Sequence, residues 1–184
     1  VMSLSAMRDV AMTVPVLRSF VKQYPVVIIT VISRPFFKSF FDGIPYITFF
    51  AFDEKERHKG FLGLLRLFQD LKRFDIDVFA NLHNVLRSKI VRNLFALSGK
   101  KTASVDKGRA EKKALTQPEN KVFEQLPTMF ERHVKVFEQL GFSVDLSNPT
   151  FPEKAVLGPE ILSIIGENHQ KLIGIAPFAQ YDSK

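Results

Sequence analysis

The sequence contains no cysteine and no long apolar run, and both absences restrict what the protein can be. Without cysteine, the 184-residue chain forms neither a disulfide nor a thiolate metal site. Its longest apolar runs, such as residues 26–29, have the length of a strand, far short of the roughly 18 residues that span a bilayer. Arg8 interrupts the N-terminus, and no signal-peptide pattern is visible. These features lead us to expect a cytoplasmic protein.

Several well-defined catalytic motifs are also missing. There is no GxGxxG or GxxxxGK[ST] sequence, so nothing indicates a common dinucleotide site or a P-loop. There is no GxSxG nucleophile elbow. His58, His133 and His169 do not have the spacing of metal ligands. We therefore expect neither a metal nor a cofactor.

What the chain does have is an uneven distribution of positive charge. The formal net charge is +7, and residues 85–113 account for all of it, with nine basic residues against Asp106 and Glu111. A concentrated basic segment favours an anionic partner, such as a phosphorylated small molecule, a nucleic acid or an acidic membrane surface. A solvated helix face would explain the same charges without any partner. The nine are Arg87, Lys89, Arg92, Lys100, Lys101, Lys107, Arg109, Lys112 and Lys113.

Apolar patterning predicts strands that alternate with helices. Residues 26–32 form a continuous β-branched run, which is typical of a strand buried on both faces. Apolar positions at helical spacing predict helices over 59–73, 86–97 and 128–141, the last opened by a capping box at Thr128 and Glu131. Such alternation predicts an α/β fold with a Rossmann-like, doubly wound parallel sheet. The expected strands are 1–4, 26–32, 46–52, 76–82 and 102–105.

Polar side chains follow the carboxyl ends of all five expected strands. In a parallel sheet these ends meet at one edge, where ligands bind. Basic residues follow four of the strands, which favours a ligand bearing phosphate or carboxylate, because the arginine fork binds oxyanions through two bonds. Asp9, after the first strand, is either a general base or a cap for the helix that follows. The residues are Ser5, Asp9, Ser33, Arg34, Asp53, Arg57, His58, Lys59, His83, Asn84, Arg87, Asp106, Lys107 and Arg109.

The stretch from Ser5 to Pro15, SAMRDVAMTVP, resembles the N-terminal signature of the heptosyltransferase-like glycosyltransferases of family 9. That signature reads Ser-x-x-Gly-Asp-x-x-x-Thr-x-Pro and follows the first strand. Shorter matches in the same order are Tyr24-Pro25, Arg34-Pro35, Asn81-Leu82-His83 with Arg87-Ser88, Lys107-Gly108-Arg109, the helix at 132–141, and the tail 173–179 with Lys184.

The resemblance implies a GT-B architecture, in which two Rossmann-like domains enclose the active site. Residues 1–168 would be the acceptor-side domain, and residues 169–184 the beginning of a donor-binding domain. The family inverts at the anomeric carbon without a metal, and its acceptor is typically the phosphorylated inner core of lipopolysaccharide. Such an acceptor places the enzyme at the inner membrane face as a peripheral protein. The donor is a nucleotide sugar of the ADP-heptose type.

The resemblance also assigns roles to residues, with one departure from the family pattern. Asp9 matches the base that deprotonates the acceptor hydroxyl, and Lys184 matches a lysine that contacts the donor phosphate. Arg8 stands where the family has glycine, and we expect it to fill space beside Asp9 or to pair with it. This half alone is expected to be inactive. The expected acceptor-binding residues are Ser5, Arg34, His58, Lys59, His83, Arg87, Lys107 and Arg109.

Two readings without catalysis remain open beside the transferase. A basic α/β module could bind nucleic acid through phosphate contacts, although the chain has no recognition motif for it. It could equally be an interaction module whose basic segment contacts a protein partner. Fold analogy does not separate these readings, because function resides in the site.

Overall fold

A computed structural model describes residues 1–154 and 156–166. Within these ranges the chain divides into two units, one covering Val1–Phe151 and the other beginning at Pro152. The second unit contains one described helix, α7 (Pro159–Ile165). The sequence also predicts a strand over 171–176. That segment, the domain boundary at 168/169 and Lys184 lie outside the described residues, and these points stay predictions.

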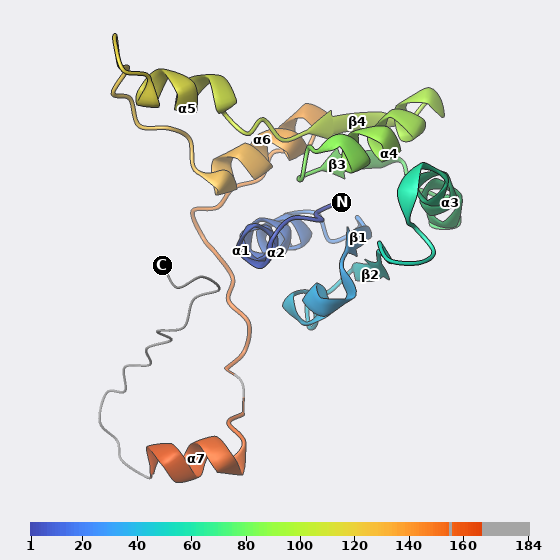
Figure 1. The fold of residues 1–184 in the computed structure, drawn as a ribbon. Helices are drawn as coiled ribbons and strands as arrows, with labels where there is room; N and C mark the ends of the chain where they lie inside the picture. Colours follow the sequence, from blue (N-terminus) through green and yellow to red (C-terminus); the bar gives the residue numbers. More distant parts are fainter. Residues whose placement is uncertain (155, 167–184) are drawn as a thin grey trace. The chain divides into compact units, whose positions relative to one another are not determined.

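The first unit is built on parallel strands that meet at its N-terminal segment (Figure 1). Strand β1 (Ile29–Ser33) pairs with β2 (Ile47–Ala51), and β3 (Val78–Asn81) pairs with β4 (Lys101–Ser104), both in parallel. Met2 forms parallel bridges to Ile32 of β1 and to Asn81 of β3. Residues 1–4 therefore occupy the centre, and the spatial order is β2, β1, residues 1–4, β3, β4. This order confirms the predicted doubly wound sheet.

Four of the five predicted strands exist, with small differences in their bounds, and the fifth, at residues 1–4, is present as isolated parallel bridges at Met2. The largest difference is at β1, which begins at Ile29 rather than at residue 26. The backbone N–H of Val27 donates to the carbonyl of Tyr24, which closes a turn around Pro25. Val26 and Ile28 are consequently exposed, although their β-branched side chains continue the apolar run.

Helices cover both faces of the sheet. Successive side chains of each strand point to opposite faces, so both faces carry side chains that need to be buried. Val31 packs into a core with Val16, Leu17 and Phe20 of α2 and with Phe137 of α6. Its neighbour Ile32 faces the other core, which contains residues of α3 and α4. The helices of this unit are α1 (Met7–Ala11), α2 (Val14–Gln23), α3 (Gly60–Lys72), α4 (Leu86–Leu97), α5 (Arg109–Thr116) and α6 (Met129–Leu140), with a 3-10 helix η1 (Pro35–Phe40).

The predicted capping box is confirmed at the start of α6. The Glu131 N–H donates to Thr128 Oγ1 at 3.2 Å, and the Thr128 N–H donates to Glu131 Oε2 at 2.6 Å. These bonds satisfy donors that would otherwise be left free at the helix N-terminus. The apolar face of α6 then buries Val136, Phe137 and Leu140 against the sheet.

Helix α5 was not predicted. It has only eight residues and buries none of them, so no apolar face long enough to indicate a helix is present. It forms from residues of good helix propensity, chiefly Ala, Lys, Glu and Leu. Four of the nine basic residues of segment 85–113, those at 107–113, lie on this exposed helix and the loop before it. No described helix is long and apolar enough to cross a membrane.

Candidate functional site

The centre of the candidate site is the point where the chain order of the sheet reverses. From residues 1–4 the chain proceeds outward to β1 and β2, then returns to the other side for β3 and β4. The loops after residues 1–4, β1 and β3 diverge there, leaving a crevice at the carboxyl edge in sheets of this kind. Ser5, Asp9, Arg34 and His83 lie on those loops or directly after them.

Asp9 is held by one neighbour and remains open to solvent. It is the third residue of α1, whose N-cap is Ala6, so Asp9 is not the capping residue. Ser5 Oγ donates to Asp9 Oδ2 at 2.6 Å. The Asp9 side chain is 37% exposed, and its Oδ1 lies 3.7 Å from Arg8 Nε. The Arg8 side chain is 87% exposed. Arg8 therefore pairs only loosely with Asp9 and does not fill the space beside it.

The pKa of His83 is shifted by several charged groups near Asp9. Burial, followed by the positive charges of Lys107 and Arg34, lowers the pKa of His83 to about 4, and the carboxylate of Asp9 acts in the opposite direction. His83 is therefore neutral at pH 7. Its turn is built by the Asn81 side chain, whose oxygen accepts from the N–H groups of His83 and Asn84 at 3.2 and 3.0 Å. The structure thus brings Asp9, Arg34, His83 and Lys107 together.

Lys107 lies in a tight loop after β4 whose geometry depends on glycine. The N–H of Gly108 donates to Asp106 Oδ1 at 2.9 Å, and Gly108 has a left-handed φ of 60°. Burial and the nearby charge of Arg109 lower the pKa of Lys107. Such a site favours an anion, which would relieve the repulsion between these cations.

Arg132 stabilises the loop after β4 through hydrogen bonds to backbone carbonyls. The sequence predicted only that Arg132 lies on a helix. Arg132 is 5% exposed and donates from Nε to the carbonyl of Pro127 and from Nη1 to that of Asp106, at 3.2 and 3.3 Å. Its guanidinium also pairs with Glu111 of α5. The proximity of Arg132 to Gly108 could not be predicted from the spacing of the two residues in the sequence.

Arg34 and Arg87 are joined by a carboxylate that the sequence did not single out. Glu54 Oε1 lies 3.3 Å from Arg34 Nε, and its Oε2 accepts from Arg87 Nη1 at 2.8 Å. Arg34 and Glu54 come from the loops after β1 and β2, and Arg87 lies in the first turn of α4, which follows β3. No local sequence signal connects them, because the pairing arises from the strand order.

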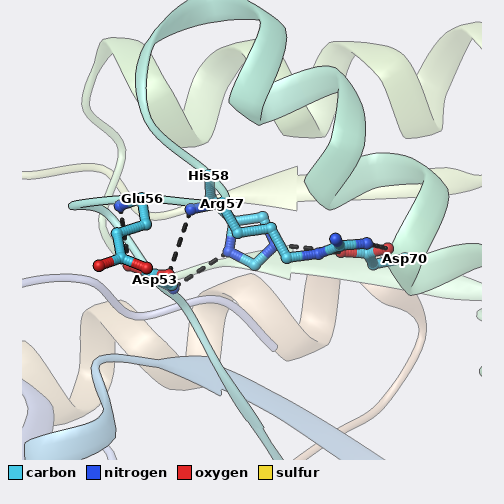
Figure 2. Close-up of polar contacts among 5 residues, drawn as sticks. All are labelled: Asp53, Glu56, Arg57, His58 and Asp70. Atoms are coloured by element: carbon cyan, nitrogen blue, oxygen red, sulfur yellow. Dashed lines mark hydrogen bonds and ion pairs between the residues drawn. The ribbon is translucent and has the colours of Figure 1, made fainter.

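His58 contacts Asp53 and Asp70 rather than this group (Figure 2). His58 is 3% exposed; its Nδ1 accepts from the Asp53 N–H at 3.0 Å, and its Nε2 lies 3.1 Å from Asp70 Oδ2. Arg57 donates two bonds to the same Asp70 carboxylate, which together hold the pKa of Asp70 well below its usual range. Both ring nitrogens of His58 are thus engaged within the fold. Lys59 is exposed at the N-cap of α3. We leave both outside the proposed site.

A cavity of the described residues lies elsewhere. It measures about 460 Å³ and is lined by residues at the amino ends of the strands, including Ile28, Ile29, Ile76 and Val78. This edge is opposite to the one that carries Asp9. Within the described ranges, no group of three or more His, Asp or Glu side chains could hold a metal ion.

Comparison with solved structures identifies the fold. The chain is similar to the glycosyl transferase family 9 structure from Veillonella parvula, with a TM-score of 0.54 and 22% sequence identity. The match covers 80% of this chain and 42% of that chain, so this chain spans less than half the length of the matched protein. No protein-family model matches the sequence, and neither does any curated protein. The predicted resemblance to family 9 glycosyltransferases is confirmed at the level of fold.

The convergence of charges around His83 is testable by titration. Replacing Lys107 by Met removes a nearby positive charge and raises the pKa of His83, whereas Asp9→Asn removes a negative charge and lowers it. NMR of the imidazole ring measures both shifts. Lys101→Met, at the amino edge of the sheet, serves as the control and leaves the pKa unchanged. Equal pKa shifts in all three variants would contradict the conclusion that Lys107 and Asp9 lie near His83.

The loop after β4 can be tested through its glycine. A Cβ at Gly108 would lie 2.6 Å from Arg132 Cζ, so Gly108→Ala displaces the guanidinium as well as straining a positive φ. Gly99→Ala is the matched control, because Gly99 also has a positive φ but has nothing within 4 Å of an added Cβ. Chemical denaturation should show a loss of about 1 kcal/mol for Gly99→Ala, and of roughly 2–3 kcal/mol for Gly108→Ala. Equal losses would mean that Arg132 moves aside without cost.

Proposed function

We propose that this chain is the acceptor-binding half of an inverting, metal-independent glycosyltransferase that uses a nucleotide-sugar donor. The supporting observation is a partly exposed carboxylate, Asp9, at the reversal point of a doubly wound sheet, surrounded by basic side chains. The fold likeness to a family 9 structure supports the same function. The chain covers 42% of the matched one, so the whole reaction also needs the remaining part of such an enzyme.

Asp9 is the proposed general base. Ser5 holds Oδ2 by a hydrogen bond, which fixes the carboxylate and leaves Oδ1 to accept a proton from substrate. As the acceptor hydroxyl loses its proton to Asp9, its oxygen attacks the anomeric carbon of the donor sugar. The bond from that carbon to the diphosphate oxygen breaks on the opposite face, so the product has inverted configuration and a nucleoside diphosphate leaves.

The basic side chains of the edge are the proposed acceptor site. Arg34, Arg87, Lys107 and Arg109 follow three different strands, and His83 is a neutral hydrogen-bonding group among them. Guanidinium and ammonium groups bind phosphate strongly, which fits the phosphorylated inner core of lipopolysaccharide. That acceptor would bring the protein to the cytoplasmic face of the inner membrane as a peripheral protein.

The donor belongs to the other half of the proposed enzyme. By the family resemblance it is a nucleotide sugar of the ADP-heptose type, with Lys184 near its phosphate. Because both substrates must be held in attack geometry, this half alone binds acceptor without transferring sugar.

Acceptor binding can be measured on this chain directly. In a calorimetric titration with a phosphorylated inner-core oligosaccharide, Arg87→Ala and Arg109→Ala each weaken binding about tenfold, the cost of a charge-assisted hydrogen bond. Lys101→Ala is the matched control, because it removes a charge from the same basic segment but at the opposite edge. It should leave binding unchanged.

The same titration separates the alternatives. Equal weakening by all three variants would mean that bulk charge, rather than a site, attracts the saccharide. Salt-sensitive binding of a DNA duplex, without any binding of the saccharide, would support a nucleic-acid-binding function instead of the transferase function.

The role of Asp9 requires a protein that carries this chain together with a donor-binding half. There, Asp9→Asn should lower kcat by about 10²–10⁴-fold, the usual contribution of a general base. KM for the acceptor should change little, since the basic side chains remain. Steady-state transfer assays give both values. A variant with full kcat would exclude Asp9 as the base.

A further inference from the structure

Glu54 bridges two arginines from different parts of the chain, Arg34 in the loop after β1 and Arg87 in the first turn of α4. Its two carboxylate oxygens are divided between them, with Oε1 3.3 Å from Arg34 Nε and Oε2 2.8 Å from Arg87 Nη1. Arg34 Nε is itself buried and makes no hydrogen bond. The rest of each side chain remains partly open, since Arg34 is 41% exposed, Arg87 55% and Glu54 30%, so a ligand in solution can reach both guanidinium groups.

The loop that carries Glu54 is fixed by its own hydrogen bonds (Figure 2). The Asp53 carboxylate accepts from the N–H groups of Lys55, Glu56 and Arg57, at 3.1, 3.0 and 3.2 Å. The buried His58 ring accepts from the Asp53 N–H and anchors the far side of the loop to Asp70. Glu54 is thus presented to the arginines by a rigid turn rather than by a mobile segment.

The bridge does not use the full binding capacity of the two arginines. A carboxylate with one oxygen per guanidinium forms neither of the two-bond contacts that arginine makes with oxyanions. Ion pairs this exposed contribute little net stability, so Glu54 can be displaced. A phosphate group carries a third oxygen and up to one more negative charge, and it can contact both guanidinium groups more completely.

We propose that Arg34 and Arg87 form an oxyanion site, which Glu54 occupies while tethered through its loop. A phosphate group of the ligand displaces Glu54 from this site. The identification of that ligand as the acceptor rests on the proposed function, whereas the oxyanion site itself does not. Because the tether keeps the Glu54 carboxylate at a high local concentration, a ligand must exceed its attraction to bind. A neutral saccharide lacks the charge to compete with Glu54 for the two arginines.

The test uses inorganic phosphate as the probe, without any sugar. In calorimetric titrations at pH 7.5, Glu54→Gln and Glu54→Ala should each bind phosphate about three- to tenfold more tightly than the unaltered chain. Glu56→Gln is the matched control, because it removes the same charge from the same loop and has no ion pair among the described residues. Its effect should be less than twofold.

Two results would overturn the proposal. If the Glu54 variants bind phosphate equally or more weakly, Glu54 is not a competitor and at most orients the arginines. If Glu56→Gln tightens binding as much, the gain comes from general charge. In an Arg87→Ala background, the gain from Glu54→Gln should disappear, and its persistence would place the phosphate elsewhere. Because no saccharide is used, these results are independent of whether the chain binds an acceptor.

Discussion

The backbone pairing of Met2 is the constraint on which the rest of this structure depends. Its N–H donates to the carbonyl of Ala80 and its carbonyl accepts from the N–H of Leu82, both in the segment around β3. On the other side, the carbonyl of Val1 accepts from the N–H of Ile32 in β1, and the N–H of Ser3 donates to the carbonyl of Ile32. Four residues thereby join two pairs of strands into one sheet. Without this pairing the loops after β1 and β3 would not share an edge, and neither Asp9 nor the arginines would face His83.

That edge accumulates positive charge, and the fold balances it with carboxylates in fixed positions. Glu54 bridges Arg34 and Arg87, Glu111 pairs with the buried Arg132, and Asp9 lies near Lys107. These acids differ in how firmly they are held. Glu111 faces a guanidinium that is almost fully buried, so its removal would leave an uncompensated buried charge. Asp9 and Glu54 lie at the exposed part of the edge, where a ligand can compete with their present partners.

The elements that the sequence predicted correctly are those in which local pattern and tertiary environment agree. The β-branched residues 29–32 form a strand because both faces of it are covered, and Thr128 with Glu131 caps α6 through bonds three residues apart. Asp9, Arg34, His83 and Lys107 were found because each follows a strand. Glu54, Arg132 and α5 were missed, since the first two depend on partners 20 to 33 residues away and the third buries nothing. His58 satisfied the same strand-end rule, but burial against Phe52 and Asp70 gives it a structural role.

Arg8 stands where the signature that this sequence resembles has glycine, and this difference has a simple physical consequence in the fold. A glycine is required only where φ is positive or where a side chain would collide, and Arg8 lies within α1 with an 87% exposed side chain. Among the described residues other than glycine, φ is positive at Tyr46, Asp75, Asn84 and Asn120. The arginine therefore adds a solvated charge beside Asp9 without displacing it. A solvated cation at 3.7 Å is screened by water and leaves the Ser5 hydrogen bond as the main restraint on the carboxylate. The hydrogen bond from Ser5 to Asp9 thus forms with arginine at position 8.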